Sequence, residues 1–285
     1  MDYPDKLGAL NAIYSLLKSL KGQRIVIKYG GAAMRDKQLT EQVVKNIILL
    51  QDLGLQCIVV HGGGPAINQL LDQLHVEPKF DQGIRVTNSH TMEVVQMVLA
   101  GKVNKNIVAL LSASGARAIG LSGHDNCLIK ALPISLETDN RVANVDSINT
   151  DFLELLIDNE YIPVIAPIGI VPSGISYNIN ADIIASSVAS ELNADMLVML
   201  TDTPGILKDP KDSTTLLENL TISQVNLLIE QGVIVGGMIP KVQACLNALK
   251  NGVKITKVID GRESNSLLLS LMNESALGTS IISGE

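Results

Sequence analysis

The chain alternates between short apolar runs and longer segments in which apolar positions recur with helical spacing. The apolar runs predict buried strands at 24–28, 56–60, 162–167, 196–200 and 255–260. The segments with helical spacing predict helices at 38–53, 65–74, 91–112, 150–159, 182–192, 223–230 and 240–250. Strands that alternate with helices predict an α/β fold, a three-layer αβα sandwich around a mostly parallel open sheet.

Turn and cap residues refine several of these elements. "FDQGIRVTN" at 80–88 has the turn residues of a hairpin, and short β-like segments with Gly, Pro and Asn occupy 117–149. Gly101 predicts a break or bend in the long helix at 91–112. We expect Ser223 to cap its helix and Pro240 to stand near the first position of the last one.

The organisation beyond single elements is that of two lobes. No internal repeat, composition break or long linker marks a boundary, so we place a division near residue 190. An N-terminal lobe at 21–190 would then precede a C-terminal lobe at 191–285. Within 1–20, an apolar stripe of Leu and Tyr at 7–20 predicts an additional amphipathic helix. That helix could pack on its own domain or meet another subunit.

Composition excludes several classes of function. A chain of 285 residues with 46% hydrophobic and 18% charged residues can bury a full core and is not disordered. The net charge of −7 argues against an extended surface for nucleic acid. Two Phe, five Tyr and no Trp leave little material for stacking bases. We therefore expect no nucleic-acid partner.

Cysteine content and hydropathy bear on the compartment. Cys57, Cys127 and Cys245 are odd in number and far apart, which favours free thiols in a reducing compartment over disulfides or zinc. The first residues have no clear apolar core with a cleavage site, so we expect no signal peptide. We also expect no membrane span, because no run has the apolar length that one needs.

Two glycine turns follow the first two predicted strands. "IKYGGAAM" places Gly30 and Gly31 after one strand, and "VVHGGGPAIN" places three glycines and a proline after the next. Neither matches the P-loop or the Gly-x-Gly-x-x-Gly pattern of a dinucleotide fold. Ligands of open α/β sheets bind beyond the carboxyl ends of the strands, and helix N-termini favour anions. Three glycines in a row favour close approach of a ligand to the backbone over a simple tight turn.

Two lysines accompany these turns. Lys28 stands near the end of the first strand, and Lys241 follows Pro240 near the start of a helix. A cation at a helix N-terminus opposes the helix dipole at a cost of roughly 0.3–1 kcal/mol. An anion bound between Lys241 and the helix end would explain this placement. Two lysines and two sets of backbone amides around one anion describe a phosphoryl-transfer site.

Other polar residues allow two interpretations. In "YNINADIIASSVA", Asn180 and Asp182 could simply cap a helix and favour its first turn. Alternatively, Asp182 orients the lysine ammonium groups while Asn178 binds substrate. The four histidines show no metal-ligand spacing, and we assign none of them a catalytic role and no metal site to the chain.

Six blocks occur in the order found in the amino acid kinase family: "KYGGAAM", "VHGGGPAIN", "GIRVTNSHTMEVVQMVLAGKVNKNIVALL", "NINAD", "LTDTPGIL" and "GGMIPK". The resemblance covers about residues 7–282 and is to the branch of the family that phosphorylates N-acetyl-L-glutamate. It implies ATP-dependent phosphorylation of the side-chain carboxylate, giving N-acetyl-L-glutamyl 5-phosphate in arginine biosynthesis. The N-terminal lobe would then bind acetylglutamate and dimerise, and the C-terminal lobe would bind ATP with Mg²⁺.

The resemblance also implies a role for individual residues. Lys28 and Lys241 would stabilise the transferring phosphoryl group, and Asp182 would organise both lysines. Acetylglutamate would contact Gly63, Gly64, Arg85 and Asn178. ATP would contact Gly30, Gly31, Thr201, Asp202, Gly205, Ile206 and Leu207, with the 233–241 stretch completing the site.

The chain departs from the family pattern at several positions. Tyr29 replaces a commoner leucine, and His124 and Asn126 stand where Lys and Gly are usual. In arginine-inhibited members, an N-terminal helix like that at 7–20 links three dimers into a hexamer beside an arginine pocket. Lys257, Ser270 and Ala276 stand where His, Glu and Gly are usual in that pocket. We therefore expect a hexamer on which arginine acts weakly.

Competing interpretations remain at this point. Another amino acid kinase, acting on glutamate, aspartate or UMP, is the runner-up, although "GIRVT" with Arg85 favours acetylglutamate. A non-catalytic effector-binding protein of the same fold would not need both Lys28 and Lys241. The low aromatic content with many Ile and Asn suggests an AT-rich genome, as in an organelle or a cyanobacterium-like source. The compartment would then be a plastid stroma or a bacterial cytoplasm, in lineages where the resemblance implies the PII signalling protein as a partner.

Overall fold

The structure is a computed structural model that describes residues 15, 18–34, 36–81, 84–135, 139–272 and 277–284. Within these ranges, one eight-stranded sheet runs through the molecule in the order β12-β14-β13-β11-β1-β2-β8-β5. Its strands are β1 (Arg24–Tyr29), β2 (Gln56–His61), β5 (Ala118–Leu121), β8 (Ile162–Ile165), β11 (Met196–Thr201), β12 (Asn219–Thr221), β13 (Ile255–Asp260) and β14 (Thr279–Ile282).

This sheet is mostly parallel. The strands from β13 to β5 pair in parallel, β14 pairs antiparallel to β13, and β12 pairs in parallel with β14. Strands β1, β2, β11 and β13 therefore end along one edge of the sheet, as a parallel sheet requires. The predicted fold class is confirmed.

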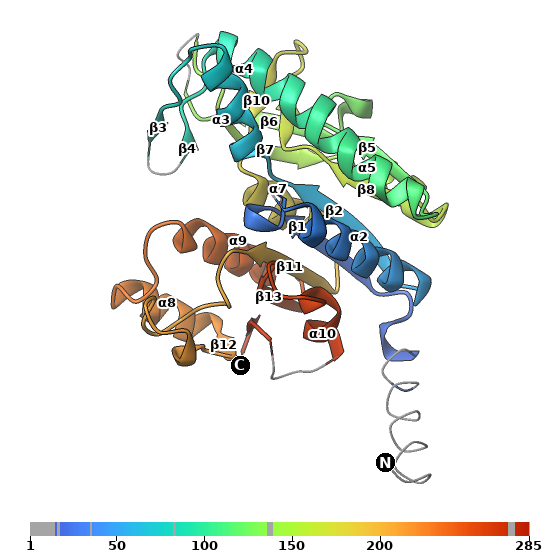
Figure 1. The fold of residues 1–285 in the computed structure, drawn as a ribbon, viewed down its shortest axis with the longest axis vertical. Helices are drawn as coiled ribbons and strands as arrows, with labels where there is room; N and C mark the ends of the chain where they lie inside the picture. Colours follow the sequence, from blue (N-terminus) through green and yellow to red (C-terminus); the bar gives the residue numbers. More distant parts are fainter. Residues whose placement is uncertain are drawn as a thin grey trace, which may run out of the picture.

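A smaller sheet lies in the upper part of the molecule as drawn in Figure 1. It has the order β10-β9-β6-β7, formed by β6 (Ile129–Pro133), β7 (Ala143–Ile148), β9 (Ile168–Ile170) and β10 (Ser176–Asn178). The predicted hairpin is present as β3 (Phe80–Asp81) paired antiparallel with β4 (Ile84–Arg85).

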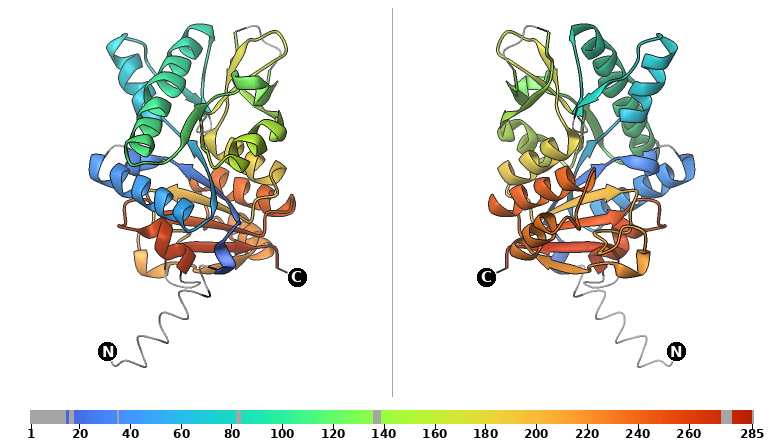
Figure 2. Two further views of the ribbon diagram at one scale, coloured as in Figure 1. Left: turned by 90° about the vertical axis from the view of Figure 1, so that its right-hand side faces the viewer. Right: turned by 90° about the vertical axis from the view of Figure 1, so that its left-hand side faces the viewer.

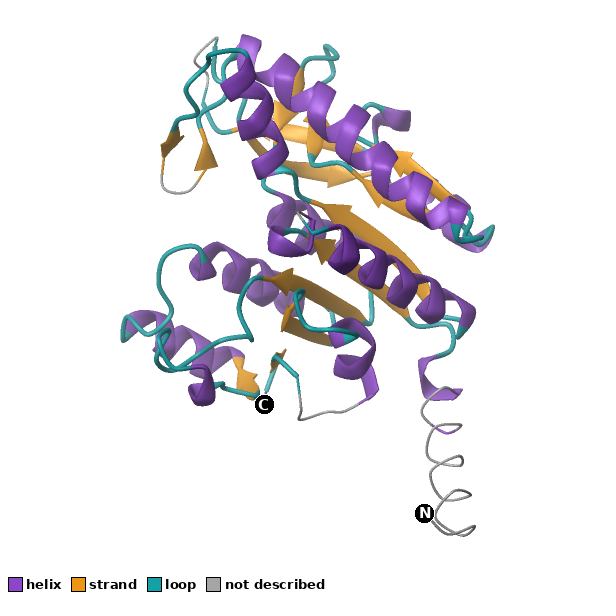
Figure 3. Ribbon diagram, viewed as in Figure 1, coloured by secondary structure: helices purple, strands orange, loops and turns teal. Residues whose placement is uncertain are grey.

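Helices cover both faces of the main sheet, which gives the three layers (Figure 3). One face packs against α6 (Thr150–Asp158), α7 (Ala181–Glu191), α8 (Ile222–Glu230) and α9 (Met238–Lys250). The other face packs against α2 (Lys37–Asp52), α3 (Gly64–Gln73), α10 (Ser266–Met272) and a long helix over 89–113. Short 3-10 turns are η1 (Gly31–Met34), η3 (Asp125–Cys127) and η4 (Ser213–Thr215).

The alternation of side chains along each strand decides which groups can meet. In β1, Ile25 and Ile27 belong to the core that faces α2, whereas Val26 belongs to the core that faces α7 and α9. Lys28 follows Val26 by two residues and therefore lies on the α7 and α9 face. By the same alternation in β2, Val60 lies on that face and His61 on the face of the long helix.

The long helix contains an irregular middle segment. It consists of α4 (Ser89–Gln96), the π-helical segment η2 (Met97–Val103) and α5 (Asn104–Ala113). The irregularity predicted at Gly101 therefore takes the form of a wider turn around that residue, and the helix continues through it. Helix boundaries elsewhere agree with the sequence patterns to within about two residues, the usual uncertainty at helix ends.

This helix passes the length and hydropathy test for a membrane span, so the expectation that no segment approaches such a span is wrong. Its polar positions explain why it nevertheless belongs to the core layer. Val95, Leu99 and Leu111 are buried against the sheet, whereas Glu93 and Lys102 are exposed on the opposite face. Charged side chains facing lipid would be costly, so this is the pattern of a helix that covers a sheet in water.

Two details of the C-terminal helices differ from the predictions. Thr221, not Ser223, caps α8: its hydroxyl accepts from the Gln224 N–H, and the Gln224 side chain accepts from the Thr221 N–H. This reciprocal arrangement satisfies two backbone donors, which a cap at 223 would not do. Helix α9 begins at Met238, so Pro240 and Lys241 lie two residues further into its first turn than predicted.

The two side views in Figure 2 show how the chain is divided in space. Elements of the C-terminal part, in orange and red, gather at one end, and elements in green and yellow gather at the other. The order of the main sheet places β11 to β14 on one side of β1 and places β2, β8 and β5 on the other. The exact lobe boundaries stay a prediction. Most of the helix predicted at 7–20, and therefore its interface, lies outside the described residues.

Candidate active site

The candidate site lies where β1, β2 and β11 end and α7 and α9 begin. Lys28 comes from the end of β1, Asp182 from the first turn of α7 and Lys241 from the first turn of α9. Lys28 Nζ lies 3.0 Å from Asp182 Oδ1, and Lys241 Nζ donates to Asp182 Oδ2 across 3.0 Å. The Lys28–Asp182 contact is short enough for an ion pair but does not have the geometry of a hydrogen bond. The structure therefore joins all three residues predicted as catalytic.

Burial and charge act together on this cluster. Burial lowers the pKa of Lys28 and the Lys241 ammonium adds to this effect, while Asp182 opposes it. Burial alone would raise the pKa of Asp182, but the two lysines outweigh it and hold the pKa below its usual value. Two cations and one anion leave a net positive charge at the amino ends of two helices. Such a place favours a bound anion.

The interpretation of Asp182 as a simple first-turn residue is incomplete. Asn180 does cap α7, because its side chain accepts from the Asp182 N–H across 2.7 Å. The Asp182 carboxylate is nevertheless buried between the lysines and does not face solvent at the helix start. Asn180 therefore caps the helix, and the Asp182 carboxylate contacts both lysine ammonium groups.

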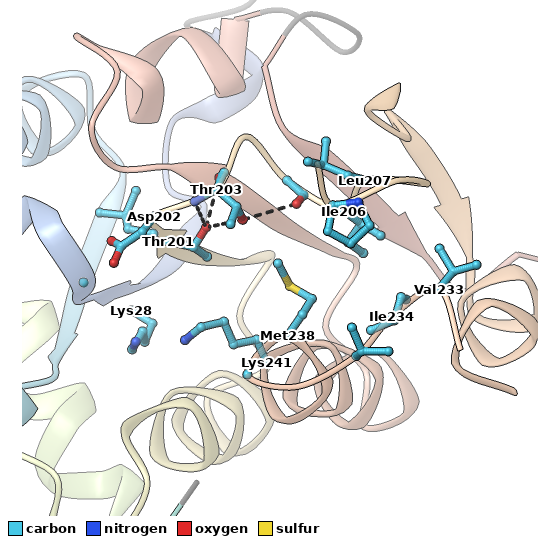
Figure 4. Close-up of a pocket in the computed structure, with 16 residues that line it drawn as sticks. Lys28, Thr201, Asp202, Thr203, Ile206, Leu207, Val233, Ile234, Met238 and Lys241 are labelled. Atoms are coloured by element: carbon cyan, nitrogen blue, oxygen red, sulfur yellow. Dashed lines mark hydrogen bonds between the residues drawn. The ribbon is translucent and has the colours of Figure 1, made fainter. Parts of the chain in front are cut away.

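A cavity of about 450 Å³ opens beside the lysines, and Figure 4 shows Lys28 and Lys241 side by side among the residues that line it. Its walls include Gly31, Thr201, Asp202, Gly205, Ile206 and Leu207, six of the seven residues predicted for ATP. The predicted 233–241 stretch contributes Val233, Ile234, Val235, Gly237, Met238 and Lys241. Thr203, from the "TDTPGIL" stretch of the resemblance, also lines the wall, and Leu200 and Pro210, which were not predicted, complete it.

The turn after β11 is held by its own hydroxyl groups. Thr201 Oγ1 accepts from the Thr203 N–H across 3.1 Å, and Thr203 Oγ1 donates to the Gly205 carbonyl. The apolar side chains of Ile206, Val233 and Met238 also line the cavity (Figure 4). This aliphatic wall fits a chain with few aromatic side chains on which a base could stack.

Gly30, the seventh predicted ATP residue, is placed differently. It does not line the cavity but lies beside the Lys28 side chain, where an added Cβ would be 2.7 Å from Nζ. Its lack of a side chain therefore leaves room for the ammonium group. Gly31 lies against Asp202 with φ of +71°, a conformation that favours glycine.

Arg85 is the last residue of β4, the second strand of the hairpin. Its guanidinium is buried, stacks 4.8 Å from the Phe80 ring, and donates from Nη2 to Asn68 Oδ1 and the Gly64 carbonyl. Burial lowers its pKa. Nη1 is buried and has no acceptor among the described residues. A guanidinium with an unused buried donor is suited to a carboxylate that the protein itself does not supply.

Hydrogen bonds connect the residues predicted to bind substrate. Asn178 Nδ2 donates to Thr87 Oγ1 across 3.1 Å, and Thr87 Oγ1 donates to the Arg85 carbonyl across 2.9 Å. Arg85 in turn contacts Gly64 at the start of α3. No atom of the protein lies within 4 Å of an added Cβ at Gly64, so the turn is open there. Gly63 lies under the turn against Leu99.

Sequence reasoning missed Asn68 and Thr87, which position Arg85 and Asn178. Asn68 lies one helical turn after Gly64, so the helical period could have placed it on the same face. Thr87 gave no such signal, because its partner Asn178 is 91 residues away in the chain. Among the described residues, no group of three or more His, Cys, Asp or Glu is arranged to hold a metal ion.

The departures noted for the arginine pocket lie on the opposite face of the sheet from Lys28. Lys257 in β13 is buried, and its ammonium donates to the Ser270 carbonyl near the end of α10. These two positions are therefore in direct contact. Ala276 lies outside the described residues.

Comparisons with known proteins show the family to which the chain belongs. The profile of the amino acid kinase family matches residues 23–260. Acetylglutamate kinase from Syntrophomonas wolfei is 48% identical over 267 residues, covering 93% of each chain. Acetylglutamate kinase from Porphyra purpurea is 45% identical, covering 94% of this chain and 95% of its own. That from Synechococcus elongatus is 44% identical, covering 98% of this chain and 92% of its own.

Solved structures share the fold. N-acetylglutamate synthase from Neisseria gonorrhoeae, complexed with coenzyme A and N-acetyl-glutamate, superposes with a TM-score of 0.85 at 24% identity. The match covers 98% of this chain and 64% of that one. Carbamate kinase from Giardia lamblia bound to AMP-PNP superposes with a TM-score of 0.69 at 19% identity, covering 92% of this chain and 99% of that one. By the family profile that matches residues 23–260 and by its near-full-length similarity to acetylglutamate kinases, the chain belongs to the amino acid kinase family.

Proposed function

We propose that the protein transfers the γ-phosphoryl group of ATP to the side-chain carboxylate of N-acetyl-L-glutamate. The product is N-acetyl-L-glutamyl 5-phosphate, the second intermediate of arginine biosynthesis by the acetylated route. The observation that carries the proposal is the Lys28–Asp182–Lys241 cluster, whose two lysines line a nucleotide-sized cavity. The buried Arg85 guanidinium with its unused donor supports it further. Near-full-length similarity to acetylglutamate kinases supports the choice of acceptor.

The reaction brings two anions together, so charge neutralisation is the main requirement. A carboxylate oxygen of the acceptor attacks the γ-phosphorus in line, a new O–P bond forms, and the bond to the β-γ bridging oxygen breaks to release ADP. Lys28 and Lys241 place ammonium groups where charge develops on the transferring group. Asp182 holds both ammonium groups apart and in place, which limits the reorganisation needed during transfer.

Recognition of the acceptor is assigned to the opposite side of the cluster. Arg85 pairs with a carboxylate of acetylglutamate through its unused Nη1 donor, and Asn178 supplies an amide held by Thr87. Gly63 and Gly64 present backbone N–H groups at the start of α3. The nucleotide occupies the cavity of Gly31, Thr201 and Ile206, with Mg²⁺ entering as part of the MgATP substrate. The remaining predicted ATP residues line the same cavity, and Gly30 leaves room for the Lys28 ammonium group beside it.

An ADP-release assay with MgATP and a panel of acceptors tests this proposal. N-acetyl-L-glutamate should be phosphorylated, whereas glutamate, aspartate and UMP should be poor acceptors. Turnover of glutamate or UMP in preference to acetylglutamate would reassign the protein within the family. Absence of turnover with all four acceptors, together with specific acetylglutamate binding, would indicate a non-catalytic effector-binding protein.

Finer properties follow from the same resemblance. We propose a homodimer that assembles as a trimer of dimers through the helix at 7–20, and a PII signalling protein as a partner. Relatives from cyanobacteria and a red alga support a bacterial cytoplasm or a plastid stroma as the compartment. Light scattering of the full chain and of a variant that lacks residues 1–20 tests the assembly, which fails if both give the same number of subunits. A pull-down with purified PII tests the partner.

A further inference from the structure

His61 is the last residue of β2 and stands directly before the glycine turn. Its side chain is fully buried on the face of the long helix, away from the lysine cluster. The imidazole makes two contacts: Nδ1 lies 2.7 Å from the Gly62 carbonyl oxygen, and Nε2 lies 3.1 Å from Asn104 Nδ2. The reaction proposed above does not use this buried group.

The surroundings decide which ring nitrogen carries the proton. Asn104 Nδ2 lies 2.8 Å from the Val164 carbonyl oxygen, which can only accept a hydrogen bond. The amide nitrogen of Asn104 must therefore face both Val164 and His61, so it donates to Nε2. A neutral imidazole that accepts at Nε2 carries its proton on Nδ1. Nδ1–H therefore donates to the Gly62 carbonyl, which also can only accept.

Anchoring of the Gly62 carbonyl also fixes the next N–H group. In a trans peptide, the C=O of Gly62 and the N–H of Gly63 point in opposite directions. The carbonyl points inward to the buried ring, so the Gly63 N–H points away from it. No hydrogen-bond acceptor for this N–H is found in the described part of the chain. The Gly63 N–H is thus an unused donor at the start of α3, beside Gly64 and Arg85.

Residues of the long helix contact both His61 and the glycine turn. Asn104 is the first residue of α5 and follows the π-helical segment η2. Leu99 in the same segment packs under Gly63, at a distance that leaves no room for a side chain there. π-helical turns often occur at functional sites, since they displace side chains from regular helical positions. Here the irregular segment brings both Leu99 and Asn104 under one glycine turn.

We infer that His61 is a positioning residue that, held by Asn104, sets the direction of the Gly63 N–H toward the acceptor carboxylate. This inference rests on the proposed function in that the ligand of the turn is acetylglutamate. His61 does not itself exchange protons with substrate, because its ring faces away from the lysine cluster and both nitrogens are already used. Its contribution is to acceptor binding and not to nucleotide binding.

Steady-state kinetics of three variants test the inference. His61→Leu removes both contacts, whereas His61→Asn places an amide donor near the position of Nδ1 and can still hold Gly62. His90→Asn is the matched control, since His90 is exposed on α4. We expect His61→Leu to raise KM for acetylglutamate about tenfold, as the loss of one hydrogen bond implies. KM for ATP should stay within about twofold, His61→Asn should recover most of the loss, and the control should resemble wild type.

Each outcome decides the matter. An equal rise of both KM values, or His61→Asn behaving like His61→Leu, overturns the inference. A second measurement covers the case in which His61→Leu fails to fold: ¹⁵N NMR of histidine-labelled wild-type protein should show His61 protonated at Nδ1 and not at Nε2. A proton on Nε2 overturns the inference. If wild type does not phosphorylate acetylglutamate, the proposed function fails, whereas the tautomer still tests the anchoring of the turn.

Discussion

Lys241 Nζ donates to Asp182 Oδ2 across 3.0 Å, and this contact joins the first turn of α9 to the first turn of α7. Both helices therefore direct their amino ends, with their positive dipole ends, at one point. A lysine at such a point would be unfavourable without an anion. The single negative charge of Asp182 neutralises only one of the two lysine charges. The remaining positive charge is available to a phosphoryl group.

The first prediction concerns turnover. Lys28→Ala or Lys241→Ala should each lower kcat by about 10²–10³, the effect of losing one donor to the transition-state charge. Lys254→Ala is the matched control, because Lys254 pairs with Asp195 at 2.6 Å on the exposed surface. Kinetics and thermal unfolding should be measured together. Wild-type kcat in a stably folded Lys28 or Lys241 variant would refute the two-lysine mechanism.

The second prediction concerns acceptor binding by Arg85. Its buried Nη1 lacks a partner in the described chain, so a substrate carboxylate would form a charge-assisted pair there. Arg85→Ala should raise KM for acetylglutamate between about tenfold and 150-fold, with much less change in KM for ATP. Arg117→Ala removes a guanidinium that stacks on Tyr161 and serves as control. A change confined to ATP would contradict the assignment.

The third prediction concerns the nucleotide cavity. Gly31 has φ of +71° and lies against Asp202, so Gly31→Ala forces the side chain or the turn to move. KM for ATP should rise severalfold while KM for acetylglutamate stays nearly constant. Gly22→Ala is a matched control, because Gly22 has φ of +82° but has open space around it. If both variants change KM for ATP equally, backbone strain and not the Asp202 contact is responsible.

Prediction from sequence succeeded where the determinants are local. Apolar runs located the central strands, and the period of two along β1 places Lys28 on the face where α7 and α9 begin. The glycine turns were recognised because consecutive glycines directly follow apolar runs in the sequence. Predictions were incomplete where partners are distant in the chain, as with Thr87 and Asn178, which are 91 residues apart. His61 was passed over because its role depends on Asn104, which is brought to it by a helical irregularity.

The fourth prediction concerns the pH dependence of stability. Burial lowers the pKa of His61 to about 4, below its ordinary value of 6.5. The unfolded chain then binds the proton more readily between these values, so the free energy of unfolding should fall as pH drops from 6.5 to 4. For this one group, the slope approaches about 1.4 kcal/mol per pH unit. The lowered pKa of Asp182 makes stability depend on pH mainly below 3.8, which lies outside the range from pH 6.5 to 4.

Urea unfolding of wild type and His61→Asn at several pH values checks this. The loss of stability between pH 6.5 and 4 should be smaller in the variant by up to about 3 kcal/mol. His90→Asn should retain the wild-type slope. Equal slopes in all three proteins would show that His61 becomes protonated in the folded state without a penalty.

The last prediction concerns regulation by arginine. Lys257 and Ser270 stand where arginine-inhibited relatives are expected to have His and Glu, and here the Lys257 ammonium donates to the Ser270 carbonyl. The buried lysine places a positive charge where an incoming guanidinium would bind, and serine offers no carboxylate to pair with it. Each change should weaken arginine binding by about 1–3 kcal/mol. Activity should therefore fall only at high arginine concentration.

Arginine titrations of wild type and of the Lys257→His/Ser270→Glu double variant test this, with the double variant expected to be more sensitive. Strong inhibition of wild type at micromolar arginine would show that other residues form the pocket.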